Sequence, residues 1–379
     1  MIKYTLGDVV KVISKRVDNP SNCEYDKFVG LEHYVSGEIE IKKYGDTSLL
    51  KSAMKVFKSG DILIARRNVY LKRASIVNFD GITSGDSIVL RTEDNLLRRI
   101  IPFILNTDDF WGYAEKFSDG TMSKRLSPKV LLEYEFSLPE KDKQEKLSEL
   151  LWAFNNTKEA YKKLIYFTDE LIESKFIEMF GLPTDNAKGF DKGTIRDVVS
   201  EVKYGTSKPA SDGGQFPYLR MNNITYDGKL DLTDLKFIDI SEQEIEKYIV
   251  RKGDILFNRT NSKELVGKTC MFNLDKPMII AGYIIRVRVN DKLLPEYLST
   301  FLNLKYSKNS LFEMCKSAIG QANINAQELQ DIEIIIPPVC LQYEFLDLLH
   351  RTDKSKLELK QALVELDATC KKIIHENIA

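Results

Sequence analysis

The chain has 379 residues, of which 43% are hydrophobic and 29% charged, and this composition and length predict a globular protein of two or three domains. No apolar run approaches the ~20 residues that cross a membrane, and MIKYTLGDVV at the N-terminus lacks the features of a secretory signal. The net charge of −1 does not by itself indicate a nucleic-acid binder, nor does it exclude one, because acidic helices can offset a basic face.

Cysteine usage favours a reducing compartment. The five cysteines are scattered and include no C-x-x-C pair, so we expect reduced, buried thiols in a cytoplasmic protein. They are Cys23, Cys270, Cys315, Cys340 and Cys370.

Five segments of the first half recur in the same order in the second half. GDIL begins at Gly60 and again at Gly253, 193 residues later. The other pairs, at separations of 189 to 198 residues, are LGDVV (6–10) with IRDVV (195–199), TSGDSIVLR (83–91) with IAGYIIRVR (280–288), FILN (103–106) with FLNL (301–304), and 139–144 with 337–342. Such ordered repetition indicates a duplicated unit with pseudo-two-fold symmetry.

Each unit begins with a region of short β-like runs, such as DILIA and SIVL in the first copy and DILF and YIIRVRV in the second. One shorter helical segment follows, predicted at Leu96–Phe117 and at Leu294–Met314. A last strand, EYEFSLP or DIEIIIPP, ends at proline, and the apolar period then changes from 2 to about 3.5.

Two long helices are predicted at residues 141–179 and 340–375, which contain no Pro or Gly, and Gly181 and Pro183 end the first. Their apolar stripes with charged flanks are typical of a coiled coil. In the first helix one stripe comprises Leu147, Leu150, Phe154, Tyr161, Leu164 and Leu171, and a parallel seam comprises Leu151, Ile165, Ile172 and Met179, continued in the second helix by Leu349, Leu363 and Cys370.

We therefore predict a mixed α/β (α+β) fold in which two homologous globular domains are separated by an antiparallel two-helix coiled coil. The domains are residues 1–139 and 183–338, the second opening with a linker at 183–193, and the helices occupy 140–182 and 339–379. One domain would lie at each end of the helix pair, which would act as a ruler between them.

The sequence offers no catalytic site. It lacks G-x-x-x-x-G-K-[ST], H-x-x-x-H and G-x-S-x-G, as well as the [ND]-P-P-[YF] and F-x-G-x-G motifs of an amino-methyltransferase. His33 is predicted to form a hydrogen bond in a loop, and His350 and His375 to lie on the surface or the seam of the second long helix. We therefore predict no catalytic residue, no metal and no cofactor.

Polar loops at matching places in the two copies are candidate DNA contacts. Arg and Lys can donate to guanine O6 and N7, and Asn can bridge adenine N6 and N7. The alignment pairs Arg66 with Arg259 and Asn68 with Asn261. The candidates are Arg66, Arg67, Asn68, Lys72, Arg73, Lys124 and Arg125 in the first unit, and Thr206, Ser207, Lys208, Arg220, Asn222, Arg259, Asn261, Lys263, Lys268, Gln321 and Asn323 in the second.

These motifs together resemble those of specificity subunits of type I restriction–modification systems. The features that carry the resemblance are F-V-G-L-E-H at 28–33, GDIL followed by A-R-R-N or N-R-T-N, G-Q-A-N-I-N at 320–325, and the Pro and Gln that begin each long helix. The first unit departs from the pattern, since its loop at 120–125 lacks the amide-rich G-Q-x-N.

The resemblance implies two target recognition domains, each reading one part of a split, asymmetric site in double-stranded DNA. It also implies that the long helices dock adenine-N6 methyltransferase subunits, two in number, that restriction subunits join them, and that the chain itself is not an enzyme. Three alternatives stay open: a self-contained methyltransferase or nuclease, a protein scaffold without DNA contact, and a specificity subunit of a related type IIB-like or phage-exclusion system.

Overall fold

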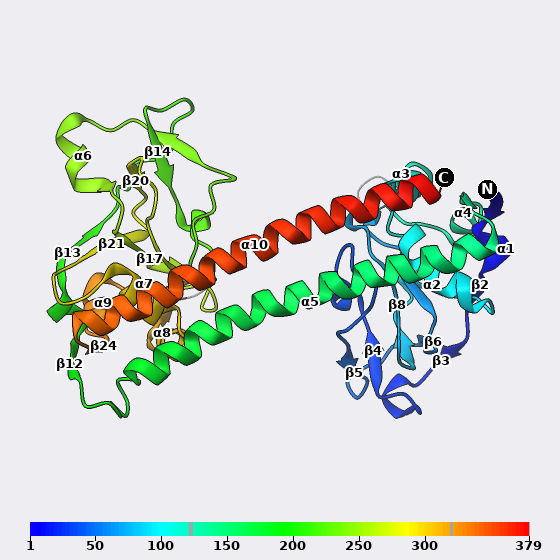
Figure 1. The fold of residues 1–379 in the computed structure, drawn as a ribbon, viewed down its shortest axis with the longest axis horizontal. Coiled ribbons are helices and arrows are strands. Elements are labelled where there is room, and N and C mark those ends of the chain that lie inside the picture. Colours follow the sequence, from blue (N-terminus) through cyan, green and yellow to red (C-terminus); the bar gives the residue numbers. More distant parts are fainter. Residues whose placement is uncertain (121–123, 319–320, 379) are drawn as a thin grey trace. The chain divides into compact units, whose positions relative to one another are not determined.

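The computed structural model describes residues 1–120, 124–318 and 321–378, and its elements are labelled in Figure 1. The chain divides into two compact units, one formed by residues 1–164 with 358–379 and the other by residues 165–357. Two long helices, α5 (Lys141–Phe180) and α10 (Val339–Asn377), each contribute residues to both units. The predicted helices at 141–179 and 340–375 are confirmed to within two residues at each end.

The first unit contains two larger sheets and one strand pair. β1 (Ile2–Thr5) pairs antiparallel with β11 (Glu135–Leu138). An antiparallel sheet has the order β2 (Lys11–Ile13), β10 (Ser87–Arg91), β7 (Ile62–Ala65) and β8 (Ala74–Ile76). The other has the order β3 (Arg16–Val17), β6 (Met54–Phe57), β9 (Gly81–Thr83), β4 (Lys27–Val29) and β5 (Gly45–Asp46), with β4 parallel to β9.

In its described residues, the second unit repeats most of this topology, without a counterpart of β3 and with one further sheet. β12 (Asp191–Thr194) pairs with β24 (Glu333–Ile336), and one sheet has the order β13 (Val199–Tyr204), β21 (Ile284–Val289), β17 (Ile255–Asn258) and β19 (Thr269–Met271). The next has the order β15 (Lys236–Ile238), β14 (Phe216–Leu219), β20 (Met278–Ile280) and β16 (Ile249–Val250), with β14 parallel to β20. A third sheet joins β18 (Thr260–Asn261), β23 (Gln321–Asn323) and β22 (Lys316–Ala318).

Each predicted shorter helical segment is in fact two helices. Residues 96–117 form α2 (Asn95–Ile104) and α3 (Asp108–Phe117), because the Thr107 side chain accepts a hydrogen bond from Phe110 N–H and caps a new helix. Residues 294–314 form α7 (Pro295–Asn303) and α8 (Lys305–Met314), since Leu304 has an extended ψ of 147°. The prediction of single helices was wrong in both copies for the same local reason, a non-helical residue between two helical runs.

The remaining helices are short. They are α1 (Leu6–Val9), α4 (Pro128–Leu132), α6 (Glu242–Tyr248), α9 (Ala326–Gln330) and the 3-10 helices η1 (Pro20–Asn22), η2 (Leu31–His33), η3 (Val69–Leu71), η4 (Ile195–Val198) and η5 (Met221–Asn223). Among the helices of the described residues, none is long and apolar enough to cross a membrane.

Equivalent hydrogen bonds confirm the duplication at the level of single atoms. Leu6 N–H donates to Tyr134 O at 2.8 Å, and Ile195 N–H donates to Ile332 O at 2.9 Å. At the start of each long helix a buried glutamine donates to a proline carbonyl: Gln144 to Pro139 at 2.7 Å and Gln342 to Pro337 at 2.8 Å. The Pro and Gln of the sequence motif therefore form the same hydrogen bond at the start of both long helices.

The long helices run antiparallel within each unit. In the first unit, Lys158 forms an ion pair with Asp367 at 3.0 Å, and the earlier Leu147 and Leu151 share a core with the later Ile374 and Ile378. In the second, Lys356 pairs with Asp169, while the Phe176 and Phe345 rings lie 5.4 Å apart. The predicted antiparallel pairing is thus confirmed within each unit.

The predicted apolar stripe of α5 was only partly right. Leu150, Leu164 and Leu171 are 42%, 48% and 43% exposed. In the parallel seam, Leu151 is buried in the first core, and Ile172 and Met179 pack against the second. A pair of helices needs one narrow seam, so a second apolar stripe stays at the surface.

Several single-residue predictions can be judged from the fold. His33 Nδ1 accepts a hydrogen bond from Gly30 N–H at 2.9 Å, which confirms its loop role, and His350 and His375 are exposed on α10. The expectation of buried thiols was wrong for Cys340, which is exposed, whereas Cys270 and Cys315 are buried.

Candidate nucleic-acid interface

In the second unit, two of the predicted polar loops form one structure. Where β17 ends, Arg259 N–H donates to Tyr283 O at 2.9 Å, and Arg259 O accepts from Ile324 N–H at 2.9 Å. Strands β18 and β23 then pair Thr260 with Asn323 and Asn261 with Ala322. The segment 259–261 is thereby fixed against 321–323, so the candidates Arg259, Asn261 and Asn323 lie together.

The first unit builds the same arrangement. Arg66 N–H donates to Asp86 O at 2.9 Å, and Arg66 O accepts from Leu126 N–H at 2.9 Å. Arg67 forms an antiparallel bridge with Arg125, and Asn68 N–H donates to Lys124 O at 3.1 Å. The part of the 120–125 loop at residues 121–123 lies outside the described residues. The backbone framework is therefore common to both units although the loop sequences differ.

The Arg259 side chain is held from two sides. Its guanidinium carbon lies 4.8 Å from the centre of the Tyr204 ring, and its Nε–H donates to Asn323 Oδ1 at 3.2 Å. The Tyr204 hydroxyl accepts in turn from Ala326 N–H at 2.8 Å. Tyr204 ends β13 and is 38% exposed. Two segments far from Arg259 in the sequence, at Tyr204 and at 323–326, thus fix this arginine.

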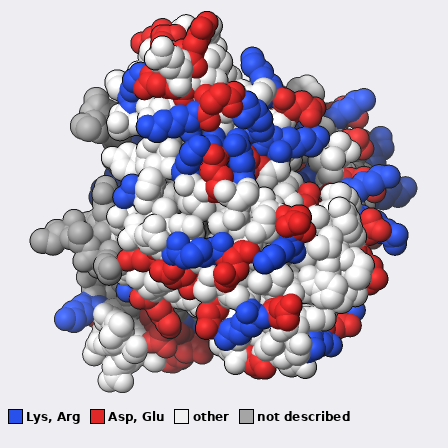
Figure 2. Space-filling view, turned by 90° about the vertical axis from the view of Figure 1, so that its left-hand side faces the viewer, with Lys and Arg blue, Asp and Glu red and all other residues white. Residues whose placement is uncertain are grey.

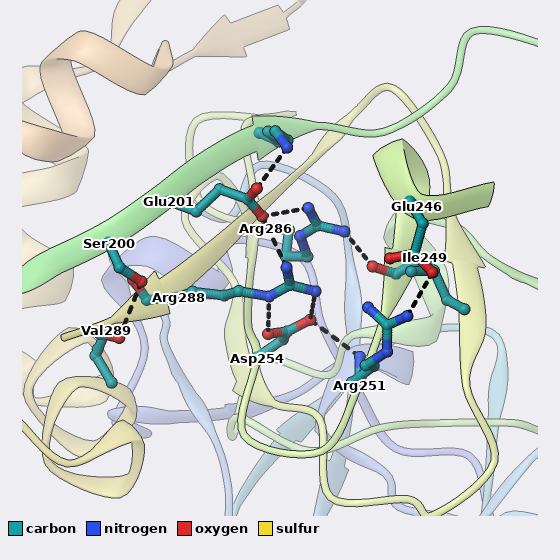
Figure 3. A network of polar contacts seen from close by, with 10 residues as sticks. Ser200, Glu201, Glu246, Ile249, Arg251, Asp254, Arg286, Arg288 and Val289 are labelled. Carbon is teal, nitrogen blue, oxygen red and sulfur yellow. Dashed lines mark hydrogen bonds and ion pairs between the residues drawn. The ribbon is translucent and has the colours of Figure 1, made fainter. Parts of the chain in front are cut away.

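The other arginines of residues 187–338 are neutralised by carboxylates, as Figure 3 shows for one network. Arg286, which is 1% exposed, donates to Glu201 and to the Ile249 carbonyl, and Arg288 pairs with Asp254 at 2.8 Å. The remaining ion pairs are Arg196–Asp331, Arg220–Asp234 and Arg251–Glu246. Within the described residues, Arg259 is the one arginine of this segment without a carboxylate partner.

Three lysines of the second unit, Lys263, Lys268 and Lys308, also have no ion pair among the described residues. Lys263 and Lys308 line a cavity of about 170 Å³ with Tyr226, Glu264, Val266, Asn309 and Phe312. Lys308 Nζ donates to Gly267 O at 2.9 Å, and Lys268 Nζ to Met221 O at 2.8 Å. Desolvation, followed by the charge of Lys268, lowers the pKa of Lys308 to about 8.

Other candidate residues are engaged within the protein. Lys208 pairs with Glu244 at 2.6 Å, and Arg220 and Asn222 both donate to Asp234. Thr206 is 2% exposed and accepts from Lys208 N–H, whereas Ser207 is exposed. Because its hydroxyl is buried, a direct contact of Thr206 with DNA is not supported. The candidate Lys268 is also buried, at 8% exposure.

In the first unit, most candidate cations are likewise paired or hydrogen-bonded. Lys72 pairs with Asp108 at 2.7 Å, and Arg73 donates to the carbonyls of Leu31 and Arg67. Arg67 and Arg125 share Asp86 at 3.3 and 3.5 Å, and both remain largely exposed. Lys124 Nζ donates to Glu115 O, and Arg66 is half-buried.

Comparison with known proteins identifies the region around this site. Residues 187–366 match the family model described as Type I restriction modification DNA specificity domain. This segment belongs to that family. The resemblance predicted from the sequence is therefore confirmed.

A curated protein similar to this chain supports the same assignment. The Type I restriction enzyme EcoKI specificity subunit of Escherichia coli K12 is 26% identical over 212 residues, 53% of this chain and 46% of that subunit. The match thus spans about half the length of that curated relative.

Solved structures confirm the predicted fold. A chain from the type I R-M system has a TM-score of 0.59 at 19% identity, covering 99% of this chain and 96% of that one. The type I S subunit from M. genitalium has a TM-score of 0.55 at 15% identity, covering 98% and 94%.

Charge on the specificity domain is mixed rather than uniformly basic. On the face drawn in Figure 2, Lys and Arg side chains gather in a band across the upper part, with Asp and Glu among them. The ion pairs of Figure 3 show how such cations are neutralised. A cation without an ion-pair partner therefore indicates a DNA-binding surface better than the total number of basic residues does.

Sequence reasoning missed Tyr204 and Lys308 as parts of the site. Tyr204 lies two residues before the candidate Thr206, but no local pattern shows that its ring lies under Arg259. Lys308 lies on α8, 40 residues or more from the polar loops of 259–268, and reaches Gly267 only in the fold. Only the pairing of β13 with β21 brings Tyr204 to the loop at Arg259.

Proposed function

We propose that this chain is the DNA-recognition subunit of a type I restriction–modification complex. Each unit reads one half of a bipartite, asymmetric site in double-stranded DNA, and the two long helices set the spacing between the halves. The single observation that carries the proposal is the loop framework built twice with the same backbone hydrogen bonds but with different side chains. Such a scaffold suits two different sequences read by one geometry.

The unpaired lysines support contact with the DNA backbone. Lys263, Lys268 and Lys308 form no ion pair among the described residues, although Glu264 lines the same cavity as Lys263 and Lys308. Burying a cation without an anion costs free energy of folding, so its retention suggests that an external anion is bound. The phosphates of DNA supply such anions and dominate the affinity of most DNA-binding proteins.

The surface of the long helices supports docking of protein partners. In the second unit, Tyr166, Phe167 and Leu171 of α5 are 57%, 59% and 43% exposed. Two adjacent aromatic residues and a leucine on one helix are more than a solvated helix needs, and such exposed apolar groups mark interaction sites. We propose that adenine methyltransferase subunits bind here and that restriction subunits join them, so that the chain directs catalysis without performing it.

Two alternatives keep specific support. The mixed charge in Figure 2 is what a protein scaffold without DNA contact would show. A specificity subunit of a related type IIB-like or phage-exclusion system would use the same fold, and its partner subunits distinguish it from the type I assignment.

Binding to duplex DNA at several salt concentrations tests the proposal. The full chain with its methyltransferase partner should bind a duplex carrying its site, and log affinity should fall linearly with log salt. The triple variant Lys263→Ala, Lys268→Ala, Lys308→Ala should reduce that slope, because fewer counterions are released. The matched control Lys252→Ala, which removes a lysine paired with Asp275, should leave the slope unchanged. Absence of binding by the assembled complex would favour the scaffold.

A further inference from the structure

Arg259 differs chemically from every other arginine of its segment. Its Nε–H donates to a neutral acceptor, Asn323 Oδ1, and its guanidinium carbon lies over the Tyr204 ring. Among the described residues, no acceptor is assigned to its two terminal nitrogens. The guanidinium therefore keeps its full charge and its outer hydrogen-bonding edge while its orientation is fixed.

We propose that Arg259 reads a guanine in the half-site of the second unit, donating from its terminal nitrogens to O6 and N7, with Tyr204 and Asn323 as positioning residues. This inference rests on the proposed function and deepens it, since it names a base and a position.

Guanine suits this geometry better than a phosphate does. The bidentate contact of arginine with guanine O6 and N7 is the commonest specific contact in the major groove, and it requires a planar fork held in one orientation. A phosphate contact needs charge more than orientation, and Lys263 and Lys308, which line a cavity of the same unit, can supply that charge. An asparagine oxygen orients the fork without neutralising it, which a carboxylate at the same place would do.

Among the described residues, the first unit lacks this arrangement. Strand registers pair Val12 with Leu90 and Val202 with Val287, so the position of Tyr204 is occupied by Ser14 in the first unit. The bridge that pairs Thr260 with Asn323 is formed in the first unit by Arg67 and Arg125, so Arg125 stands in place of Asn323. Without an aromatic ring or amide, Arg66 is not held as Arg259 is. The guanine prediction therefore applies to one half-site only.

The test uses the full chain in complex with its methyltransferase and a duplex carrying the methylated motif. Each guanine of the two half-sites is replaced in turn by 7-deazaguanine, which lacks the N7 acceptor. One replacement should weaken binding roughly 5- to 150-fold. The same replacement should have no further effect on the Arg259→Ala variant, because the partner atom is already absent. Arg251→Ala, which removes an arginine paired with Glu246, is the matched control and should preserve the full effect.

The positioning residues are tested by the same readout. Tyr204→Leu should reduce the effect of that 7-deazaguanine without unfolding the chain, as judged by its thermal melting. Tyr204→Phe keeps the ring and should retain the full effect of the 7-deazaguanine. Arg259→Lys keeps the charge but loses the fork, so it should bind DNA yet no longer discriminate that base pair.

The outcomes separate the two proposals. If the complex binds its motif but no 7-deazaguanine effect depends on Arg259, or if neither strand of the affected half-site contains guanine, the guanine assignment is wrong and DNA recognition stands. If Tyr204→Leu leaves the effect intact, Tyr204 has no positioning role. If the complex binds no specific duplex, the proposed function fails, and the base assignment fails with it.

Discussion

Lys308 is a candidate DNA contact, and the burial of its side chain is energetically unfavourable. Desolvation lowers its pKa to about 8, and its described contacts are a carbonyl oxygen and the Tyr226 ring, with Nζ 5.3 Å from the ring centre. At pH 7 the amine is protonated in the folded and the unfolded chain, so the folded state carries a desolvated charge. A residue that lowers stability in this way is expected where an anion is bound.

We predict that Lys308→Met raises the free energy of unfolding at pH 7 and weakens DNA binding. The stability gain should shrink as pH rises from about 8 to about 10.5, because the wild-type folded chain then gives up a proton that the unfolded chain retains. Urea unfolding at pH 7 and pH 10, with binding measured in parallel, checks both effects. Normal DNA binding by Lys308→Met would show that Lys308 does not contact DNA.

DNA binding by the wild-type chain should also weaken as pH rises through about 8, which is the pKa of Lys308 in the folded chain without DNA. Bound phosphate raises that pKa, so the midpoint should lie somewhat higher in the complex. Lys308→Arg, which stays charged, should bind with little dependence on pH over the same range. Equal pH profiles for the two proteins would contradict the assignment.

At the scale of elements, a carboxylate joins β13 to β21. Glu201 accepts hydrogen bonds from Lys203, from the buried Arg286 and from Arg288 (Figure 3). Burial alone would raise the pKa of Glu201, but the hydrogen bonds from Lys203 and Arg286 and the positive charge of Arg286 and Arg288 lower it overall. The stabilisation is present above the unfolded pKa near 4.5 and is lost as pH falls through the lower folded value.

We predict that Glu201→Gln destabilises the fold by about 3–5 kcal/mol, because Arg286 is left as a buried charge without its carboxylate. The double variant Glu201→Gln, Arg286→Met should recover much of this loss. Chemical denaturation of the three proteins at pH 7 provides the measurement. Equal stability of the wild-type and Glu201→Gln proteins would show that the network carries little of the fold's stability.

The paired helices contain a second buried charge. The Lys356 side chain on α10 is 7% exposed and pairs with Asp169 on α5, whose side chain is 60% exposed. Asp169→Asn should destabilise the helix pair by about 1–3 kcal/mol, and adding Lys356→Met should reverse the loss. Asp353→Asn, which changes an exposed acidic residue on α10, serves as the control. Thermal melting that fails to separate Asp169→Asn from this control would contradict the prediction.

Elements with strong local signals were the ones predictable from sequence. The bounds of α5 and α10 followed from a long helical period without Pro or Gly, and β7, β10, β17 and β21 from short β-branched runs. The break in each shorter helical segment depends on one residue, Thr107 or Leu304, whose backbone conformation the apolar pattern does not reveal. Which stripe of α5 is buried depends on its partner, so Leu150 and Leu164 were misassigned.

At the scale of the whole molecule, the duplication was visible in the sequence but the completed site was not. Matching segments predicted that the loops at Arg66 and Arg259 would be equivalent, and their backbone hydrogen bonds agree. Tyr204 and Asn323 reach Arg259 from 55 and 64 residues away, and no local pattern encodes such contacts. The same holds for Arg220 and Lys208, whose carboxylate partners could not be predicted.

If one duplicated framework reads two different DNA sequences, sequencing of modified adenines will reveal both. DNA from cells that express this chain with its methyltransferase should carry methyladenine in a motif of two short defined halves separated by a constant undefined length. Arg259→Ala should alter one half, and Arg67→Ala with Arg125→Ala should alter only the other. A single continuous motif, or a change of both halves by either variant, would contradict the account.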